Sequence, residues 1–147
     1  MSVRPIPEGY HSVTPYLVVR DVEDLLEFAG RAFGAEVIER MARADGAITH
    51  AEFRIGDSII MAGLARDEAS RMPAMLYVYL ADVDAAHSRA VEAGGTSISK
   101  PADQFYGDRV AAVSDQLGNQ WWMATHVEDV SPEELQKRAM ARAKPGA

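Results

Sequence analysis

The pattern of apolar and polar residues in the first half of the chain predicts a strand, a helix and three more strands. Residues 14–19 are rich in β-branched and aromatic side chains, which is typical of a strand. Apolar residues over 22–33 recur at helical spacing, between Asp21 as an N-cap and Gly34 as a C-terminal glycine. Three short alternating segments follow, separated by turn signals, at residues 36–42, 48–55 and 58–62. The predicted order is βαβββ.

The second half of the chain begins the same order again. Residues 76–80 predict a strand, Asp82 begins a helix, and Gly94 and Gly95 end it. An offset of 61 (82 − 21) superimposes the helix starts and matches further positions: Leu17 with Val78, Val19 with Leu80, Gly34 with Gly95 and Val37 with Ile98. Residues 55–62 match residues 117–124 at an offset of 62 (118 − 56), which implies one inserted residue. A long unit present twice indicates a duplicated domain half rather than a solenoid.

We therefore predict one domain, residues 1–130, made of two βαβββ modules at 12–63 and 74–126. Beyond it, Ser131 and Pro132 followed by two glutamates favour a helix start, so residues 131–147 are expected to form a helical tail. The chain of 147 residues is long enough to bury its own core. It has no cysteine, so His, Asp and Glu are the remaining candidate metal ligands.

Charge and hydropathy argue against two classes of partner. The formal net charge of −7 has the wrong sign for a nucleic-acid-binding protein, which neutralises phosphates with Lys and Arg. No apolar run approaches the ~20 residues of a membrane span, and the N-terminus has no apolar signal core. We expect a cytoplasmic protein that binds neither nucleic acid nor membranes, with an acidity that slightly favours cationic ligands.

A tandem βαβββ repeat with an Asp-capped helix and a closing glycine in each half resembles the vicinal oxygen chelate superfamily of glyoxalase, bleomycin-resistance and dioxygenase proteins. The resemblance covers roughly residues 12–126, and segments 103–109, 115–122 and 124–130 are similar to its PhnB-like branch. It implies an α+β fold in which the modules form a cup-shaped mixed sheet. It also implies a homodimer, and metal ligands on the first and last strand of each module.

The four positions at which the resemblance implies metal ligands hold residues that do not bind metals well. Counting from the helix starts and from the glycine before each last strand, these positions are Thr14, Ile60, Met75 and Trp122. A divalent ion needs three or four oxygen or imidazole ligands, and these side chains offer one neutral hydroxyl. No carboxylate is available there as a metal-bound base. We expect no metal and no other cofactor.

Strand alternation predicts which side chains line the cup. The first strand of the second module presents three of them and the third strand of the first module presents His50 and Glu52 as polar groups. The loop before residue 110 could close over the cup and bind an anionic group. The predicted ligand-binding residues are Tyr16, His50, Glu52, Ile60, Met75, Tyr77, Tyr79, Tyr106, Arg109, Gln120 and Trp122.

Simpler interpretations of the same residues exist. The aromatic side chains could fill the space left by the metal and form a second core. His50 and Glu52 could be a hydrogen-bonded structural pair, and Arg109 could form a salt bridge with Asp108 or Glu52. The remaining histidines, His11, His87 and His126, are expected to face solvent.

Three functions are compatible with these residues. The first is a metal-free binding protein that holds an aromatic or cationic small molecule in an aromatic-lined cavity. The second is a metal-independent isomerase, epimerase or lyase with His50 or Glu52 as general base. The third, a divalent-metal lyase of the glyoxalase type, fits the residues least well. The sequence leaves open whether the protein is an enzyme and whether the modules pair within one chain or across a dimer.

Overall fold

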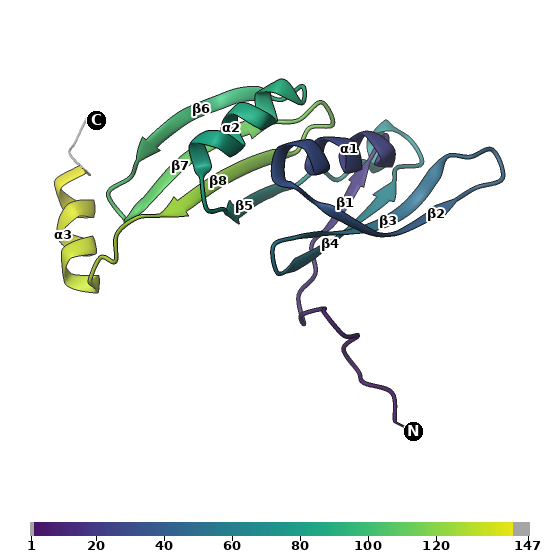
Figure 1. Ribbon diagram of the computed structural model, residues 1–147, viewed down its shortest axis with the longest axis horizontal. Coiled ribbons are helices and arrows are strands. Elements are labelled where there is room, and N and C mark those ends of the chain that lie inside the picture. Colours follow the sequence, from purple (N-terminus) through teal and green to yellow (C-terminus); the bar gives the residue numbers. More distant parts are fainter. Residues whose placement is uncertain (1, 143–147) are drawn as a thin grey trace.

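The computed structural model describes residues 2–142 and contains the predicted order of elements twice (Figure 1). The first set of elements is β1 (Tyr16–Val19), α1 (Val22–Phe33), β2 (Glu36–Ala42), β3 (Ile48–Ile55) and β4 (Ser58–Leu64). A short 3₁₀ helix, Glu68–Ser70, leads to the second set. That set is β5 (Met75–Tyr79), α2 (Val83–Glu92), β6 (Thr96–Asp103), β7 (Asp108–Ser114) and β8 (Gln120–His126), and it is followed by α3 (Pro132–Arg142).

Each set of strands forms its own mixed four-stranded sheet. The strand orders are β1-β4-β3-β2 and β5-β8-β7-β6, so the two sheets have the same topology. In each, the first and last strands pair in parallel and the other neighbours are antiparallel. The predicted α+β class with tandem βαβββ units is therefore confirmed.

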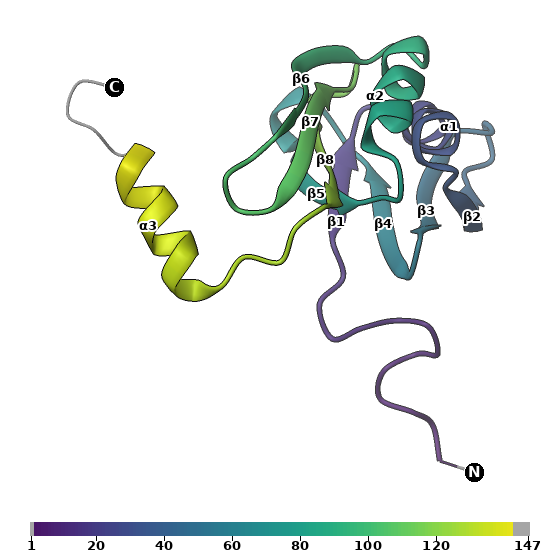
Figure 2. The same cartoon turned by 60° about the vertical axis from the view of Figure 1, so that its left-hand side comes forward.

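The helices begin and end where the sequence predicts, because the residues that cap them are adjacent to them in the sequence. The carboxylate of Asp21 accepts from the Asp24 amide at 3.0 Å, and that of Asp82 accepts from the Ala85 amide at 3.1 Å. Gly34 ends α1 at φ 67°, a left-handed conformation that glycine adopts at little cost. Both helices lie on the same side of the two sheets, next to one another (Figures 1 and 2).

One hydrophobic core joins the two halves of the chain. It contains buried residues from both sheets and from both α1 and α2. Trp121 of β8, with no exposed surface, packs against Phe33 and Phe28 of α1, with ring centroids 5.0 and 6.2 Å apart. The helices also exchange hydrogen bonds, for example from Arg89 to the Ala32 carbonyl at 3.1 Å. The core therefore lies between the helices and the sheets. The opposite face of each sheet, the cup face, is not covered by the helices.

The register of the last strands corrects one prediction. Tyr16 lies beside Met61, and Tyr77 lies beside Trp122, so the offset between β4 and β8 is 61 (122 − 61) rather than 62. Ile60 is buried in register with Phe53, on the core side of β4. The cause is a difference in hairpin length, because two residues join β3 to β4 whereas residues 115–119 join β7 to β8. Matching the turn glycines shifted the strand by one residue, which moves each side chain to the other face.

Helix α3 stands away from the two sheets (Figure 2). It is connected to the rest of the chain through Arg138, which donates to the Phe105 carbonyl at 2.9 Å and forms an ion pair with Glu128 at 2.8 Å. Residues 143–147, the end of the predicted tail, lie outside the described residues. Within residues 2–142, every helix is too short or too polar to cross a membrane.

Candidate functional site

The cup face of each sheet carries the side chains that alternation predicts. Leu17 and Val19 are buried beneath the helices, whereas Tyr16, which precedes Leu17 and points to the other face, is 49% exposed. In the second sheet, Met75, Tyr77 and Tyr79 retain 62%, 43% and 62% of their surface exposed. These side chains therefore form an open aromatic surface on the chain, and they do not pack into a second core.

A group of polar side chains, the first cluster (Tyr10, Tyr16, His50 and Glu52), lies on the cup face of the first sheet. Glu52 is only 8% exposed, and it accepts hydrogen bonds from the Tyr10 hydroxyl and from Nε2 of His50, the latter at 3.0 Å. The other ring nitrogen, Nδ1, then accepts from the Tyr16 hydroxyl at 3.2 Å. The predicted residues Tyr16, His50 and Glu52 thus form one hydrogen-bonded chain.

Two further features shape the first cluster. Tyr16 lies so close to Gly63 that a Cβ at this glycine would come within 2.6 Å of the tyrosine hydroxyl, so a larger residue at position 63 would force the Tyr16 side chain to move. The segment from residue 5 to residue 14 runs beside the cup face and, with Glu52 and Met61, lines a cavity of about 420 Å³. Tyr10 belongs to this segment, whose sequence has no strand or helix pattern that would have placed it at the site.

A second polar group, the second cluster (Tyr77, Tyr79, Asp108, His126 and Asp129), lies at one end of the cup face of the second sheet. Asp108 at the start of β7 is 3% exposed. Its Oδ2 accepts from the hydroxyls of Tyr77 at 2.7 Å and Tyr79 at 2.9 Å, and its Oδ1 lies 2.8 Å from Nδ1 of His126. On the other side of the ring, Nε2 of His126 lies 2.7 Å from Asp129. Two of these five residues, Tyr77 and Tyr79, were predicted as site residues.

The hydrogen bonds of the second cluster fix its protonation. Burial disfavours the charge on Asp108, but hydrogen bonds from His126, Tyr77 and Tyr79 outweigh it and lower the pKa of that carboxyl. The bonds to Asp108 and Asp129 raise the pKa of His126, because two carboxylates can both accept only from a doubly protonated ring. Burial and hydrogen bonding with Tyr106 and Asp108 raise the pKa of Tyr77, so it stays a neutral donor.

The remaining predicted residues fall in different places. Trp122 and Gln120 lie on the cup face of β8, where the indole donates to the Gln120 side chain at 3.1 Å. Tyr106 lies in the turn before β7, beside Tyr77. Ile60 is on the core side of β4, although it reaches the cleft between the modules, of about 260 Å³, which Tyr77 and Tyr79 also line.

The prediction for Arg109 is wrong. Its guanidinium binds Asp84 of α2 at 3.0 Å and Asp103 at 3.2 Å, on the helix side of the sheet. Arg109 follows Asp108 directly in β7, and neighbouring strand residues point to opposite faces. Because Asp108 points toward the cup face, Arg109 cannot do so. It therefore neither closes over the cup nor pairs with Asp108 or Glu52.

His126 also differs from expectation. It lies at a strand end and its side chain is half exposed, as predicted for a solvent-facing residue, yet both ring nitrogens have carboxylate partners. Its carboxylate partner Asp108 is 18 residues away in sequence. No local sequence signal links the two residues, whereas alternation along β8 would have placed His126 on the face of Trp122.

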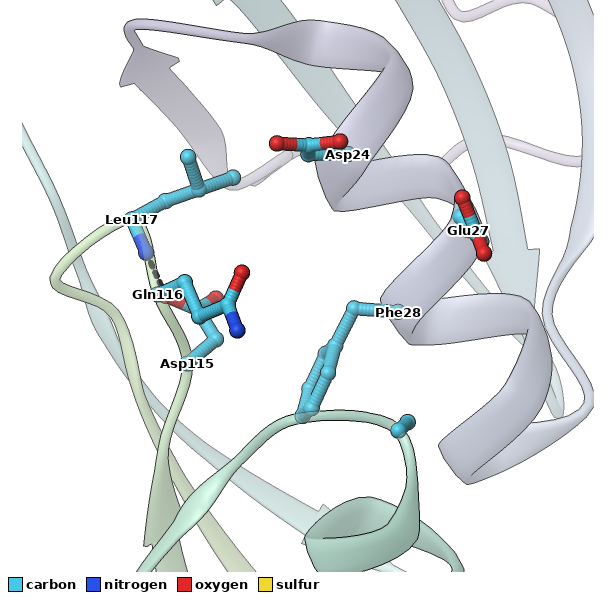
Figure 3. Close-up of a pocket in the computed structure, with 7 residues that line it drawn as sticks. Asp24, Glu27, Phe28, Asp115, Gln116 and Leu117 are labelled. Carbon is cyan, nitrogen blue, oxygen red and sulfur yellow. Dashed lines mark hydrogen bonds between the residues drawn. The ribbon is translucent and has the colours of Figure 1, made fainter.

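A separate small pocket lies on the helix side, between α1 and the β7–β8 loop (Figure 3). Asp24 and Glu27 project from α1 on one side, and Gln116 and Leu117 lie on the other. Asp115 at its base is buried, and its carboxylate accepts from the Leu117 and Asn119 amides and from the side chains of Asn119 and Trp121. Since these internal bonds occupy Asp115, we assign this pocket a structural role.

The positions of the implied metal ligands can now be tested on the structure. With the corrected register they hold Thr14, Met61, Met75 and Trp122. Thioethers and an indole are poor partners for the divalent ions that need oxygen or imidazole ligands. Within residues 2–142, no group of three or more His, Asp or Glu side chains is arranged to hold a metal ion. The residues present do not fit the metal site of the fold.

Comparison with known proteins agrees with this architecture. The family model described as "Glyoxalase/Bleomycin resistance protein/Dioxygenase superfamily" matches residues 9–123, which include both modules. The chain belongs to this superfamily. The chain is 30% identical over 139 residues to the uncharacterized protein Rv0887c of Mycobacterium tuberculosis, covering 85% of this chain and 80% of that protein.

Solved structures of other proteins have the same fold. The structure of TioX from Micromonospora sp. ML1 superimposes with a TM-score of 0.68 at 24% identity, covering 80% of this chain and 99% of TioX. A Bacillus cereus structure described as a PhnB protein and putative 3-demethylubiquinone-9 3-methyltransferase gives a TM-score of 0.63 at 14% identity, covering 78% of this chain and 99% of that one. At these identities the similarity concerns the fold alone.

Proposed function

We propose that this superfamily member is a metal-independent binding protein for an aromatic or cationic small molecule, which it holds on the aromatic cup face. The observation that carries the proposal is the exchange of metal ligands for Met61, Met75 and Trp122 beside the exposed rings of Tyr77 and Tyr79. Open aromatic and thioether surfaces with a few polar groups are typical of sites for planar ligands.

The exposed cup faces support a homodimer as the binding form. Large apolar side chains on these faces, including Tyr16, Met75 and Tyr79, are about half exposed or more, although such side chains usually gain from burial. A second copy could cover them and enclose the ligand. Sedimentation equilibrium tests this point, since a monomer at micromolar concentration would contradict it. Membership of the PhnB-like branch and a cytoplasmic location remain predictions from the sequence.

Tryptophan fluorescence tests ligand binding directly. Trp121 is buried in the core, whereas Trp122 lies on the cup face, so a ligand that stacks there should quench the emission of Trp122 selectively. We expect saturable quenching by members of a panel of planar aromatic compounds. Calorimetry should show that Trp122→Ala weakens binding and that Trp122→Phe, which keeps a ring, restores part of it. Equal affinity of the wild type and Trp122→Ala would refute binding at this face.

The first cluster favours a second candidate function, a metal-independent isomerase, epimerase or lyase. Glu52 orients His50 through Nε2, and His50 contacts the Tyr16 hydroxyl through Nδ1, beside a cavity. An orienting carboxylate, a base and a hydroxyl, linked in this order, can move a proton to and from a substrate. Turnover of a bound compound that is lost in His50→Ala but kept in Trp122→Phe would support this function. Binding without any product would leave the binding function alone.

A further inference from the structure

The buried carboxylate of the second cluster has an unusual set of partners. Asp108 is 3% exposed, and within residues 2–142 its ion-pair partner is His126 rather than a Lys or Arg side chain. Arg109, the next residue in β7, binds Asp84 and Asp103 instead, and Arg138 of α3 binds Glu128 and Glu134. A buried carboxylate is costly unless hydrogen bonds or a cation compensate it. Here the compensation comes from two phenols and one titratable ring.

Two tyrosine rings lie together beside Asp108. Tyr77 and Tyr79 are 5.4 Å apart between ring centroids, with their planes inclined by 65°, and both hydroxyls donate to the same oxygen of Asp108. Trp122 lies beside Tyr77 in the sheet, on the same face. A phenol that donates to a carboxylate gains electron density in its ring, and the negative ring face is what attracts a cation. The raised pKa values of Tyr77 and Tyr79 mean that both keep their protons and remain such donors.

The charges that face this surface have the sign that attracts a cation. Asp108 from β7 and Asp129 from the segment after β8 flank His126, so the three groups sum to −1 when the histidine is protonated and to −2 when it is neutral. The chain as a whole carries −7. An approaching cation therefore meets a negative potential in both states of His126. An approaching anion would meet aromatic ring faces and carboxylates.

We propose that the second cluster binds a small organic ammonium compound, with the faces of Tyr77, Tyr79 and Trp122 against the ammonium group and Asp108 as the opposite charge. This inference rests on the proposed function, because it names the class of ligand that the cup face of the second sheet selects. Tyr106, which contacts Tyr77 from the turn before β7, is placed to form a further wall.

A pair of probes of equal shape separates the charge from the aromatic surface. The cation is (4-hydroxyphenyl)trimethylammonium, and its neutral isostere is 4-tert-butylphenol, which carries carbon in place of the charged nitrogen. Titration calorimetry on the full-length protein should show that the cation binds roughly 5- to 30-fold more tightly than the isostere, which is the range expected for a cation–π site.

Variants should change the preference for the cation over its isostere in opposite directions. Asp108→Asn should abolish the preference, and Tyr79→Leu, at an exposed position that does not threaten folding, should reduce it. His126→Gln removes a positive charge and should increase it. The matched control is Asp103→Asn, which removes a negative charge from the helix side of the sheet and should leave the preference unchanged.

The outcomes distinguish this inference from the proposed function. If both probes bind equally well to the wild type and both lose affinity in Trp122→Ala, the cup face binds ligands but the ammonium specificity is wrong. If neither probe binds at millimolar concentration, both the inference and the proposed binding at this face are wrong. A preference that Asp103→Asn reduces as much as Asp108→Asn does would reflect net charge alone and would also overturn the inference.

Discussion

Replacing Asp115 by alanine should destabilise the protein more than any other single change in its turns. The carboxylate accepts four hydrogen bonds of 2.8–2.9 Å, from the Leu117 and Asn119 amides, the Asn119 side chain and the Trp121 indole. Asn119 and Trp121 have no exposed surface, so water cannot replace the lost acceptor at their side chains.

The size of the effect follows from these two buried donors. An unpaired buried donor costs about 1–3 kcal/mol, so two cost roughly 2–6 kcal/mol. Removing the desolvated charge of Asp115 offsets part of this cost. We expect a loss of about 3 kcal/mol in the free energy of unfolding. With a urea m-value of about 2 kcal/mol/M, the midpoint should fall by roughly 1.5 M.

Urea unfolding followed by circular dichroism measures this change. The matched control is Asp57→Ala in the corresponding hairpin of the first sheet, where the exposed carboxylate accepts, among residues 2–142, only from the neighbouring Ser58 hydroxyl. Its effect should stay within about 0.5 kcal/mol, as for most surface substitutions. If Asp115→Ala lowers stability by no more than Asp57→Ala does, the Asp115 network does not hold the loop and our reasoning is wrong.

Two further predictions concern the core and pH. Phe33→Ala should lower the free energy of unfolding by about 3 kcal/mol and the midpoint of thermal unfolding by roughly 10 °C. Val91→Ala, at an exposed position, should change the midpoint little. Similar midpoints for the two variants would contradict a shared core. The pKa of His126 is raised by its bonds to Asp108 and Asp129, so these bonds stabilise the folded state. Their contribution is complete below the pKa of the unfolded state, about 6.5, and it is lost as pH rises through the higher pKa of the folded state. Urea midpoints of the wild type and His126→Gln should therefore converge with rising pH, and a constant difference would contradict the assignment.

The fold was predictable from sequence because its signals are local. Asp21 and Gly34 bound α1 within one segment, and the Asp82 cap repeats the arrangement. The register of the last strands was not predictable, because Gly56 and Gly118 lie in hairpin turns of different length. Aligning these glycines put Ile60 at the position that Met61 occupies. Strand alternation identified the aromatic surface, since it needs no knowledge of distant contacts.

The polar clusters were only partly predictable. His50 and Glu52 are two residues apart on one strand, so their pairing is visible in the sequence. Asp108 meets Tyr77 across 31 residues, which no local pattern encodes. The error at Arg109 has a different cause. The sequence suggests a loop over residues 104–109, whereas β7 begins at Asp108 and strand alternation already applies there.

The contact of Trp121 with Phe28 and Phe33 has a consequence for how the duplicated halves behave as units. Although the halves have separate sheets, each one leaves aromatic surface uncovered when the other is removed, because the helix of the first half buries the strand of the second. Unfolding should therefore be a single cooperative transition rather than two. An isolated half would need a second copy of itself, or of its sibling, to bury the same rings. A gene duplication that began with such a self-associating half would have turned an intermolecular contact into an intramolecular one.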